Sequence, residues 1–403
     1  MAVDDQSHVT IGDVLASGEF RALWLAHSLS IVGDQIARVA LSVLVFGRTG
    51  SISITALTYA LTMVPALISG PLLGGMADRY PRRRVMVVAD LIRAVLVLVM
   101  AHPGMPLPAV GMLVVAVVML NAPFNAARLT ALADILPGDR YTVGLGVTNT
   151  TQQAVQLLGF GGGGLIVATF GPPVALTLNA ATFVVSAWAI ATFVRSRAPA
   201  TASDGRKGWL GHSALRGIRT LWRDPRLRYF ASLTWLYSFF VVPEALAVPY
   251  TTQIGASSAA IGLFMGIDPA CSAVGTLLIT RFVPPDRRNR LLAPMAVLTG
   301  VPLLCFAVQP GLPIALISLG LTGFLSSYMV VAHARFINTA PDDQRGQLIG
   351  VGTAGLIAGQ GLGILAGGAL GELLGAHCAI AICAAAGVMA ALVTIISGTA
   401  SGT

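Results

Sequence analysis

Six ionisable residues lie within long apolar stretches of the chain and are its first candidates for chemistry. They are Asp34, Arg38, Asp90, Arg93, Glu244 and Asp268. The first four form two acid–base pairs, four and three residues apart, and these spacings put both members of a pair on one face of a helix. The last two have no basic neighbour in sequence. A charge in an apolar environment is costly unless it is paired or hydrated, so each residue is a functional candidate.

The chemistry that these residue types offer is proton transfer or the binding of a charged substrate. Burial disfavours the charged form of a carboxyl group and a nearby arginine favours it, so a small movement can change its protonation. We therefore predict that Asp34 carries a coupling proton. Glu244 and Asp268 are expected either to be protonated or to face water or a cationic substrate. The alternative is structural, because neighbouring acids and bases can pair and simply lock helices together.

The elements that must position these residues are apolar helices. Of the 403 residues, 55% are hydrophobic and only 10% are charged, whereas a soluble domain carries about 25% charged residues. Apolar windows of about 20 residues, long enough to cross a hydrocarbon core of about 30 Å, recur along the chain. They are 20–46, 52–76, 86–102, 107–131, 143–169, 173–194, 228–252, 258–280, 291–308, 313–337, 346–370 and 377–397. We predict an all-α polytopic membrane protein with twelve transmembrane helices.

Basic residues gather on one side of this predicted topology. With both termini on that side, it receives the loops at 79–84 and 281–290 and the long connection 195–228, which alone holds nine Lys and Arg. The other side receives only Arg48. Because cytoplasmic loops carry the excess of Lys and Arg, both termini are predicted to be cytoplasmic. Membrane topology, and not nucleic-acid binding, therefore explains the net charge of +8. Residues 1–19 lack the pattern of a cleavable signal peptide, so the first spanning helix is expected to direct insertion.

The two halves of the chain resemble each other. At an offset of 204 residues, Pro65 matches Pro269, Arg83-Arg84 matches Arg287-Arg288, and Gly171 matches Gly375. We therefore predict an N-terminal six-helix bundle at 1–194, a basic cytoplasmic linker at 195–227 and a C-terminal six-helix bundle at 228–403. Two parallel six-helix repeats are the architecture of rocking transporters, whose substrate site lies near mid-membrane between the halves.

Glycines recur at helical spacing in the fifth and eleventh windows. They are Gly159, Gly163, Gly355, Gly359, Gly363 and Gly367. Small residues four apart let two helix backbones approach closely. Two interpretations stay open: static close packing, and a smooth surface along which helices slide during transport.

A charged motif occupies the loop between the second and third windows. It reads Gly74-x-x-x-Asp78-Arg79-x-Pro81-Arg82-Arg83-Arg84. This motif resembles the signature loop of the major facilitator superfamily, with Pro81 in place of a glycine. Residues 28–46, 89–94 and 123–140 are similar to the branch of that family that exports multidrug, macrolide and siderophore compounds. In the fifth window, Phe160 replaces a proline that antiporters of the family often carry.

The resemblance implies a gate at the cytoplasmic side. Its candidate residues are Gly74, Asp78, Arg79, Arg82, Arg83 and Arg128. The first three are expected to form a latch, in which Asp78 accepts hydrogen bonds from Arg79 or from a facing helix N-terminus. The arginines after Pro81 are interpreted chiefly as topology signals. Arg128 corresponds to Arg335 near the same offset between the two halves, and both are interpreted as parts of a charge network at the cytoplasmic helix ends.

A further set of residues can line a substrate cavity between the halves. They are Gln152, Gln153, Gln156, Gln360, Trp235 and Phe239. Glutamine side chains offer hydrogen bonds, and aromatic faces suit a hydrophobic or cationic ligand. The alternative for the aromatic residues is ordinary core packing or contact with lipid.

Together these features predict a secondary active transporter that exports small hydrophobic or amphipathic compounds, such as drugs, antibiotics or secondary metabolites, in exchange for protons. The expected partners are the substrate, protons and the lipid of a prokaryotic plasma membrane, and the chain is expected to be a monomer without metal or cofactor. No motif of a membrane-embedded enzyme is found. Two alternatives stay open: a proton-coupled importer, because fold does not set direction, and a non-transporting sensor or scaffold, which would need few intramembrane charges.

Overall fold

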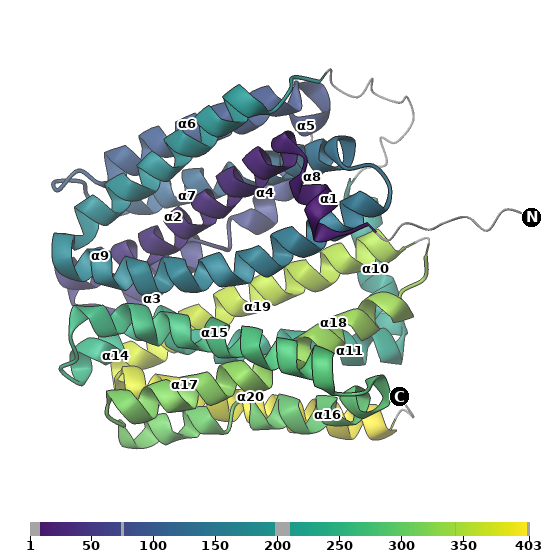
Figure 1. The fold of residues 1–403 in the computed structure, drawn as a ribbon. Helices are drawn as coiled ribbons and strands as arrows, with labels where there is room; N and C mark the ends of the chain where they lie inside the picture. Colours follow the sequence, from purple (N-terminus) through teal and green to yellow (C-terminus); the bar gives the residue numbers. More distant parts are fainter. Residues whose placement is uncertain (1–8, 74–75, 198–209, 343, 401–403) are drawn as a thin grey trace, which may run out of the picture.

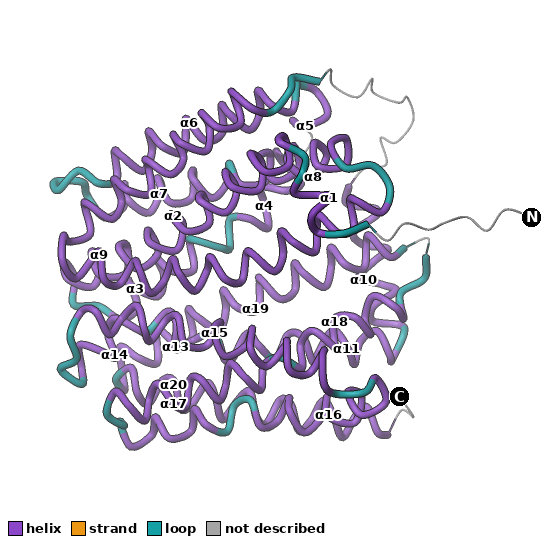
Figure 2. Tube along the Cα trace, viewed as in Figure 1, coloured by secondary structure: helices purple, strands orange, loops and turns teal. Residues whose placement is uncertain are grey.

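The computed structural model describes residues 9–73, 76–197, 210–342 and 344–400, and every regular element within these ranges is helical (Figure 2). The first half of the chain holds α1 (Ile11–Leu15), α2 (Gly18–Thr49), α3 (Ile52–Leu61), α4 (Ala66–Leu73), α5 (Met76–Arg79), α6 (Arg82–Met100), α7 (Leu107–Met119), α8 (Asn121–Ile135) and α9 (Asp139–Phe193). The second half holds α10 (Leu210–Arg223), α11 (Pro225–Trp235), α12 (Tyr237–Phe240), α13 (Val242–Ala245), α14 (Ala247–Gln253), α15 (Ser258–Phe282), α16 (Pro285–Leu298), the 3₁₀ helix η1 (Pro302–Val308), α17 (Leu312–Ser326), α18 (Tyr328–Thr339), α19 (Arg345–Leu374) and α20 (Ala376–Ala400). The predicted all-α architecture is confirmed.

Many of these helices are suited to a membrane. In the part of the chain that the structure describes, nine helical segments are long and apolar enough to span it, or ten if the bent segment at 225–253 is one span. The 55-residue α9 is about 80 Å long at 1.5 Å per residue, far more than one span needs. It bends at Gly171, where φ is 80° and ψ 168°, and its two arms coincide with the fifth and sixth predicted windows. α6 carries five charged residues, which keeps it out of the count of nine. Each of the twelve predicted windows contains helix.

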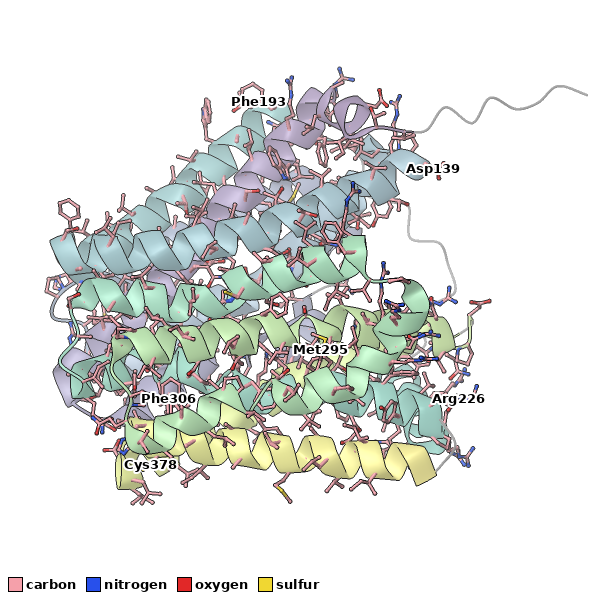
Figure 3. All side chains as sticks on the ribbon, turned by 60° about the horizontal axis from the view of Figure 1, so that its bottom comes forward. Asp139, Phe193, Arg226, Met295, Phe306 and Cys378 are labelled. Carbon is pink, nitrogen blue, oxygen red and sulfur yellow. The ribbon has the colours of Figure 1, made fainter. Side chains whose placement is uncertain are left out.

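The helices form two bundles that lie side by side (Figure 1). The N-terminal bundle comprises α2 to α9 and the C-terminal bundle α11 to α20. We call the end that holds α1, α10 and the C-terminal end of α20 the terminus face, and the other end the opposite face. Figure 3 places Asp139 and Arg226 at the terminus face, and Phe306 and Cys378 at the opposite face. The bundles meet along two seams, α3 against α19 and α9 against α15.

Glycines let the helix backbones approach each other closely at both seams. A Cβ atom built on Gly164 of α9 would lie 2.5 Å from the Cα and N atoms of Gly262 in α15, so these two backbones touch. In the other seam, the glycines of α19 that face α3 or the residues just after it are Gly361, Gly368 and Gly371. Side chains at these positions would push the bundles apart.

The glycines predicted from their spacing lie on other surfaces. Those of α19 are Gly355, Gly359, Gly363 and Gly367, and they pack against Trp235, Ser238 and Val242 of the same bundle. Gly159 and Gly163 pack against Gln35 and Ile36 of α2, again within one bundle. These contacts favour static packing for the predicted glycines. The glycines at which the two bundles meet are a different set.

Two segments near the bundle interface are broken. α3 ends at Leu61 and α4 begins at Ala66, directly after Pro65. The segment α11 to α14 contains Pro243 and Pro249 and bends by 47° before α14. A proline removes a helical hydrogen bond and crowds the preceding turn, which accounts for such breaks. They position Tyr59 and Glu244, described below.

Two glycines matched by the sequence repeat have the same backbone role. Gly171 joins the two arms of α9 with a φ of 80°, and Gly375 joins α19 to α20 with a φ of 86°. This left-handed region is readily adopted only by glycine. The two residues therefore make equivalent sharp turns at the opposite face.

The charged motif is described only in part. Gly74 and the side chain of Asp78 lie outside the described structure, so the latch stays a prediction. Arg79 is exposed. Arg82 forms an ion pair with Asp134 of α8, and Arg83 donates a hydrogen bond to the carbonyl oxygen of Ala191 in α9. These two arginines thus tie α6 to two neighbouring helices, a contact that topology alone does not require.

Candidate functional site

A cavity of about 400 Å³ lies in the N-terminal bundle. Its walls come from α2, the break between α3 and α4, α6, α8 and the first arm of α9, and Ile357 of α19 adds a contact from the other bundle. Its charged and amide side chains are His27, Asp34, Gln35, Arg38, Arg93, Asn121, Asn125, Arg128 and Gln152. A smaller cavity of about 60 Å³ shares Asp34 and Arg38 and continues toward Asn179. The cavity is thus polar at a depth where the surrounding helices are apolar.

Asp34 is paired with a residue of another helix. Arg93 Nη2 of α6 lies 3.1 Å from Asp34 Oδ2, and within the described residues no ion pair joins Asp34 to Arg38. The same guanidinium holds Asp90, with Nη1 3.2 Å from Oδ1. Ser186 Oγ donates a hydrogen bond of 2.6 Å to Asp90 Oδ2. The side chain of Asp90 is fully buried, whereas that of Asp34 is 31% exposed and lines the cavity. Of the two carboxylates, Asp34 is therefore the one that can exchange a proton with the cavity.

Aromatic rings fix the position of this arginine. The guanidinium carbon of Arg93 lies 4.0 Å from the ring centroid of Phe183 and 5.9 Å from that of Phe124. A ring face attracts a cation and restricts its orientation. Arg93 is therefore held between two carboxylates at a fixed place in the bundle.

Glu244 connects the two bundles. Tyr59 Oη of α3 donates a hydrogen bond of 2.5 Å to Glu244 Oε1 of α13. The guanidinium carbon of Arg38 lies 6.0 Å from the ring centroid of Tyr59 and interacts electrostatically with both Asp34 and Glu244. Arg38 therefore links the cavity carboxylate to the carboxylate at the interface.

Asp268 has a similar tyrosine partner. Tyr237 Oη of α12 donates a hydrogen bond of 3.0 Å to Asp268 Oδ1 of α15. Asp268 and Glu244 also interact electrostatically. The two acids without basic neighbours in sequence are thus each bonded to a phenolic hydroxyl.

Arg128 lies on the cavity wall. Its Nε atom is buried without a hydrogen-bond partner, and the described part of the chain offers it no ion pair. His27 of α2 is close enough to interact with its charge. Its repeat mate Arg335 is exposed and donates a hydrogen bond of 2.9 Å to Asn289. The two arginines that the repeat relates therefore differ in environment.

The predicted glutamines are placed differently from one another. Gln152 lines the cavity of the N-terminal bundle. Gln153 is exposed, and Gln156 and Gln360 are half-buried outside the residues that line the cavity. Gln153 faces another direction than Gln152, whereas Gln156 lies one helical turn farther along the same face of α9, beyond the residues that line the cavity.

The predicted aromatic residues pack within the C-terminal bundle. Trp235 Nε1 donates a hydrogen bond of 2.9 Å to the carbonyl oxygen of Gly352, and its indole fills the space left by Gly355. Phe239 lies against Gly387 of α20. Both contacts support the packing alternative.

Sequence reasoning did not single out three residues of this network: Tyr59, Tyr237 and Ser186. Tyrosine and serine are common in apolar helices, so their presence alone is no signal. A buried phenolic hydroxyl does require a hydrogen-bond partner. This rule predicts that Tyr59 and Tyr237 have hydrogen-bond partners, but it does not predict which carboxylate each one bonds.

Comparison with known proteins agrees with this architecture. The family model described as "Major Facilitator Superfamily" matches residues 23–247 and 245–400. The chain belongs to the major facilitator superfamily. It is therefore a secondary transporter of a small molecule, embedded in a membrane through several spans, and not an enzyme. The family resemblance of the charged motif is confirmed.

Relatives within the superfamily cover most of the chain. It is 29% identical over 375 residues to the multidrug efflux pump Tap of Mycobacterium tuberculosis, covering 87% of this chain and 86% of the relative. It is 26% identical over 309 residues to the lysophospholipid transporter LplT of Yersinia enterocolitica, covering 74% and 71%. A solved bacterial homologue of the human lysosomal transporter Spinster, inward-facing and occupied, has a TM-score of 0.72 over 94% of both chains at 12% identity, which shows the shared fold.

Proposed function

We propose that this transporter exports small hydrophobic or amphipathic compounds in exchange for protons, by alternating access between its two bundles. The relationship to a multidrug efflux pump supports export. The relationship to a lysophospholipid transporter supports a substrate with an apolar body. Both relatives are bacterial, which supports a location in the cell membrane.

The observation that carries the proposal is the hydrogen bond between Tyr59 and Glu244, which lies beside Arg38, a residue that also interacts electrostatically with Asp34. A proton that binds Asp34 removes its negative charge. Arg38 is then attracted mainly to Glu244, and Arg93 mainly to Asp90, so the charge balance at the bundle interface changes. In this way proton binding at the cavity alters the contact between the bundles, which is what coupling requires.

The bundles are held together near the opposite face. Ser53 N and Ser51 Oγ donate hydrogen bonds of 2.9 and 3.0 Å to Glu372 Oε2, and Ser53 Oγ donates one of 3.1 Å to the carbonyl oxygen of Gly368. The cavity lies toward the other end, because it is lined by His27, early in α2. In our proposal this is the cytoplasm-facing state, with the external side closed.

The direction of the chain in the membrane follows from its charges. Arg195 and Arg197 pair with Glu19 at the terminus face, and Arg226 lies at the same end. Excess Arg and Lys favours the cytoplasmic side. The terminus face is therefore cytoplasmic in the proposal, and the latch at Asp78 closes that side when the cavity opens outward.

The test is transport into liposomes that contain the purified protein. A pH gradient with the liposome interior acidic, so that protons leave as substrate enters, should drive accumulation of compounds from a panel of antibiotics and fluorescent drugs. A pH-sensitive dye measures the proton movement at the same time. One charge crossing 100 mV supplies about 2.3 kcal/mol, enough for modest accumulation. Asp34→Asn should abolish proton-driven accumulation while substrate exchange without a gradient persists. Unchanged proton-driven transport in that variant would remove Asp34 from the mechanism.

A proton-coupled importer is the second candidate. Phe160, which stands where antiporters often carry proline, favours it. The same liposomes separate the two functions, because an importer moves substrate and protons in the same direction. A sensor or scaffold predicts no substrate movement under any gradient.

A further inference from the structure

Two arginines on the cavity wall form no ion pair with a residue that the structure describes. Arg38 and Arg128 both line the 400 Å³ cavity, and the described residues provide neither with an ion pair. The third lining arginine, Arg93, already holds Asp34 and Asp90. Arg38 interacts electrostatically with Asp34 and Glu244, whereas no carboxylate of the described residues pairs with Arg128. The three arginines are balanced when Asp34, Asp90 and Glu244 are all ionised, and the group becomes net positive when Asp34 binds a proton.

A buried cation such as Arg128 is costly inside a membrane protein unless an anion neutralises it. Desolvation penalises each cation, and a partner anion restores the lost interaction. The guanidinium group is planar and can give two parallel hydrogen bonds to a carboxylate or phosphate. Beside the arginines, the amides of Asn121, Asn125 and Gln152 can donate further hydrogen bonds.

Part of the cavity wall is apolar. Met63, Phe124 and Ile357 line the same cavity. A ligand that matches both surfaces has an anionic head and an apolar body. Among the described lining residues, the one carboxylate that a cationic ligand would meet is Asp34, which is already bonded to Arg93.

Resting on the transport function proposed above, we propose that the cavity selects amphipathic anions, and that Arg128 binds the carboxylate or phosphate head with Arg38 as the second cation. The apolar body lies against Phe124 and the neighbouring apolar wall. This goes beyond the general class of amphipathic compounds, because it excludes cations as preferred ligands.

Another role for Arg128 has to be separated from this one. Arg128 is also predicted to belong to the cytoplasmic gate, together with Asp78. If that were its whole role, replacing Asp78 would have the same effect as replacing Arg128, and the head group of the ligand would not matter. A ligand-binding role predicts instead a selective loss for anions.

The test is binding to the purified full-length protein in zwitterionic nanodiscs by calorimetry, without any gradient. The probes are octyl phosphate, octanoate, octyltrimethylammonium and inorganic phosphate. Both octyl anions should bind at least about 10-fold more tightly than the octyl cation, and Arg128→Gln should weaken anion binding by about 10-fold or more, as expected for lost charge-assisted hydrogen bonds. Arg128→Lys should recover part of the loss, and Arg38→Gln should weaken the anions as well.

The matched controls are Arg335→Gln, which removes the repeat-related arginine outside the cavity, and Asp78→Asn. Both should leave anion affinity within about twofold, since neither residue contributes to the proposed site. Equal binding of anion and cation, or equal effects of Arg128→Gln and either control, overturns the proposal. Inorganic phosphate that binds as tightly as octyl phosphate overturns the requirement for an apolar body.

Because binding is measured without a gradient, its result is independent of the transport assay. Anion selectivity without proton-driven transport would refute the coupling and leave the binding site standing. Proton-driven transport without anion selectivity would support the coupling and refute the proposed anion site.

Discussion

Tyr59 Oη lies 2.5 Å from Glu244 Oε1, and this hydrogen bond joins α3 of the N-terminal bundle to α13 of the C-terminal bundle. The two residues are separated by 185 positions in sequence. A transporter that works by rocking two bundles must break such a contact in each cycle. In the alternating-access cycle that we propose, the strength of this bond helps to set the ratio between the two states.

Tyr59→Phe should shift the conformational equilibrium toward the state open at the opposite face. A hydrogen bond to a charged group contributes about 1.5–3 kcal/mol, so the ratio of closed to open molecules should fall roughly 10- to 100-fold. Spin labels placed across the opposite face would report the change as a longer distance distribution. The control is Tyr237→Phe, which removes a bond within one bundle. The same shift in both variants would contradict the role of the Tyr59–Glu244 bond.

Glu372→Ala should loosen the seal at the opposite face. Glu372 Oε2 accepts from the backbone N–H of Ser53 and the hydroxyl of Ser51 at the N-terminus of α3, where a negative charge is favoured. Loss of these bonds should raise, by about 10-fold, the labelling rate of Ile52→Cys by an impermeant maleimide in a cysteine-free background. Glu19→Ala is the control, because Glu19 bonds Arg197 within one bundle. No rise above that control would contradict the prediction.

Arg93→Gln should destabilise the N-terminal bundle more than Asp34→Asn does. Removing the arginine leaves the buried Asp90 and its neighbour Asp34 without their cation, a change that costs about 3–5 kcal/mol in buried ion pairs. In the Asp34→Asn variant, Arg93 still forms its ion pair with Asp90. Thermal unfolding of the detergent-purified variants should show a clearly larger drop in Tm for Arg93→Gln. Equal drops would mean that the two carboxylates do not share the arginine.

Gly164→Val should stop transport while the protein still inserts and folds as two bundles. A side chain at Gly164 would collide with the backbone of Gly262 in the other bundle, so the seam between α9 and α15 could not close. Transport should fall by about 10-fold or more in the liposome assay, as for an overpacked contact that costs 1–3 kcal/mol. Gly161→Val and Gly162→Val are matched controls, since a Cβ atom at either position meets open space. Full activity of Gly164→Val would show that the bundles need not approach here.

Several features of this protein could be read from the sequence because they depend on local properties. Hydropathy located helix in all twelve windows, since crossing a hydrocarbon core requires about 20 apolar residues whatever their neighbours are. The charged motif at 74–84 indicated the family correctly. The position of Gly171 and its match to Gly375 indicated equivalent turns, because only glycine readily adopts that backbone conformation.

The partners of the functional side chains were decided by tertiary structure. Spacing placed Arg38 on the same helix face as Asp34, but the packing of α6 against the same bundle brings Arg93 to Asp34 instead. The partner of Glu244 is Tyr59, from the other bundle. Glycines lie on two faces of α19, one toward α3 and one toward the helices of its own bundle. Their spacing alone could not show which of the two faces contacts α3. Helical periodicity fixes the faces of one helix, whereas the rotation of that helix against its neighbours depends on contacts summed over the whole bundle, and only those contacts decide which charges meet.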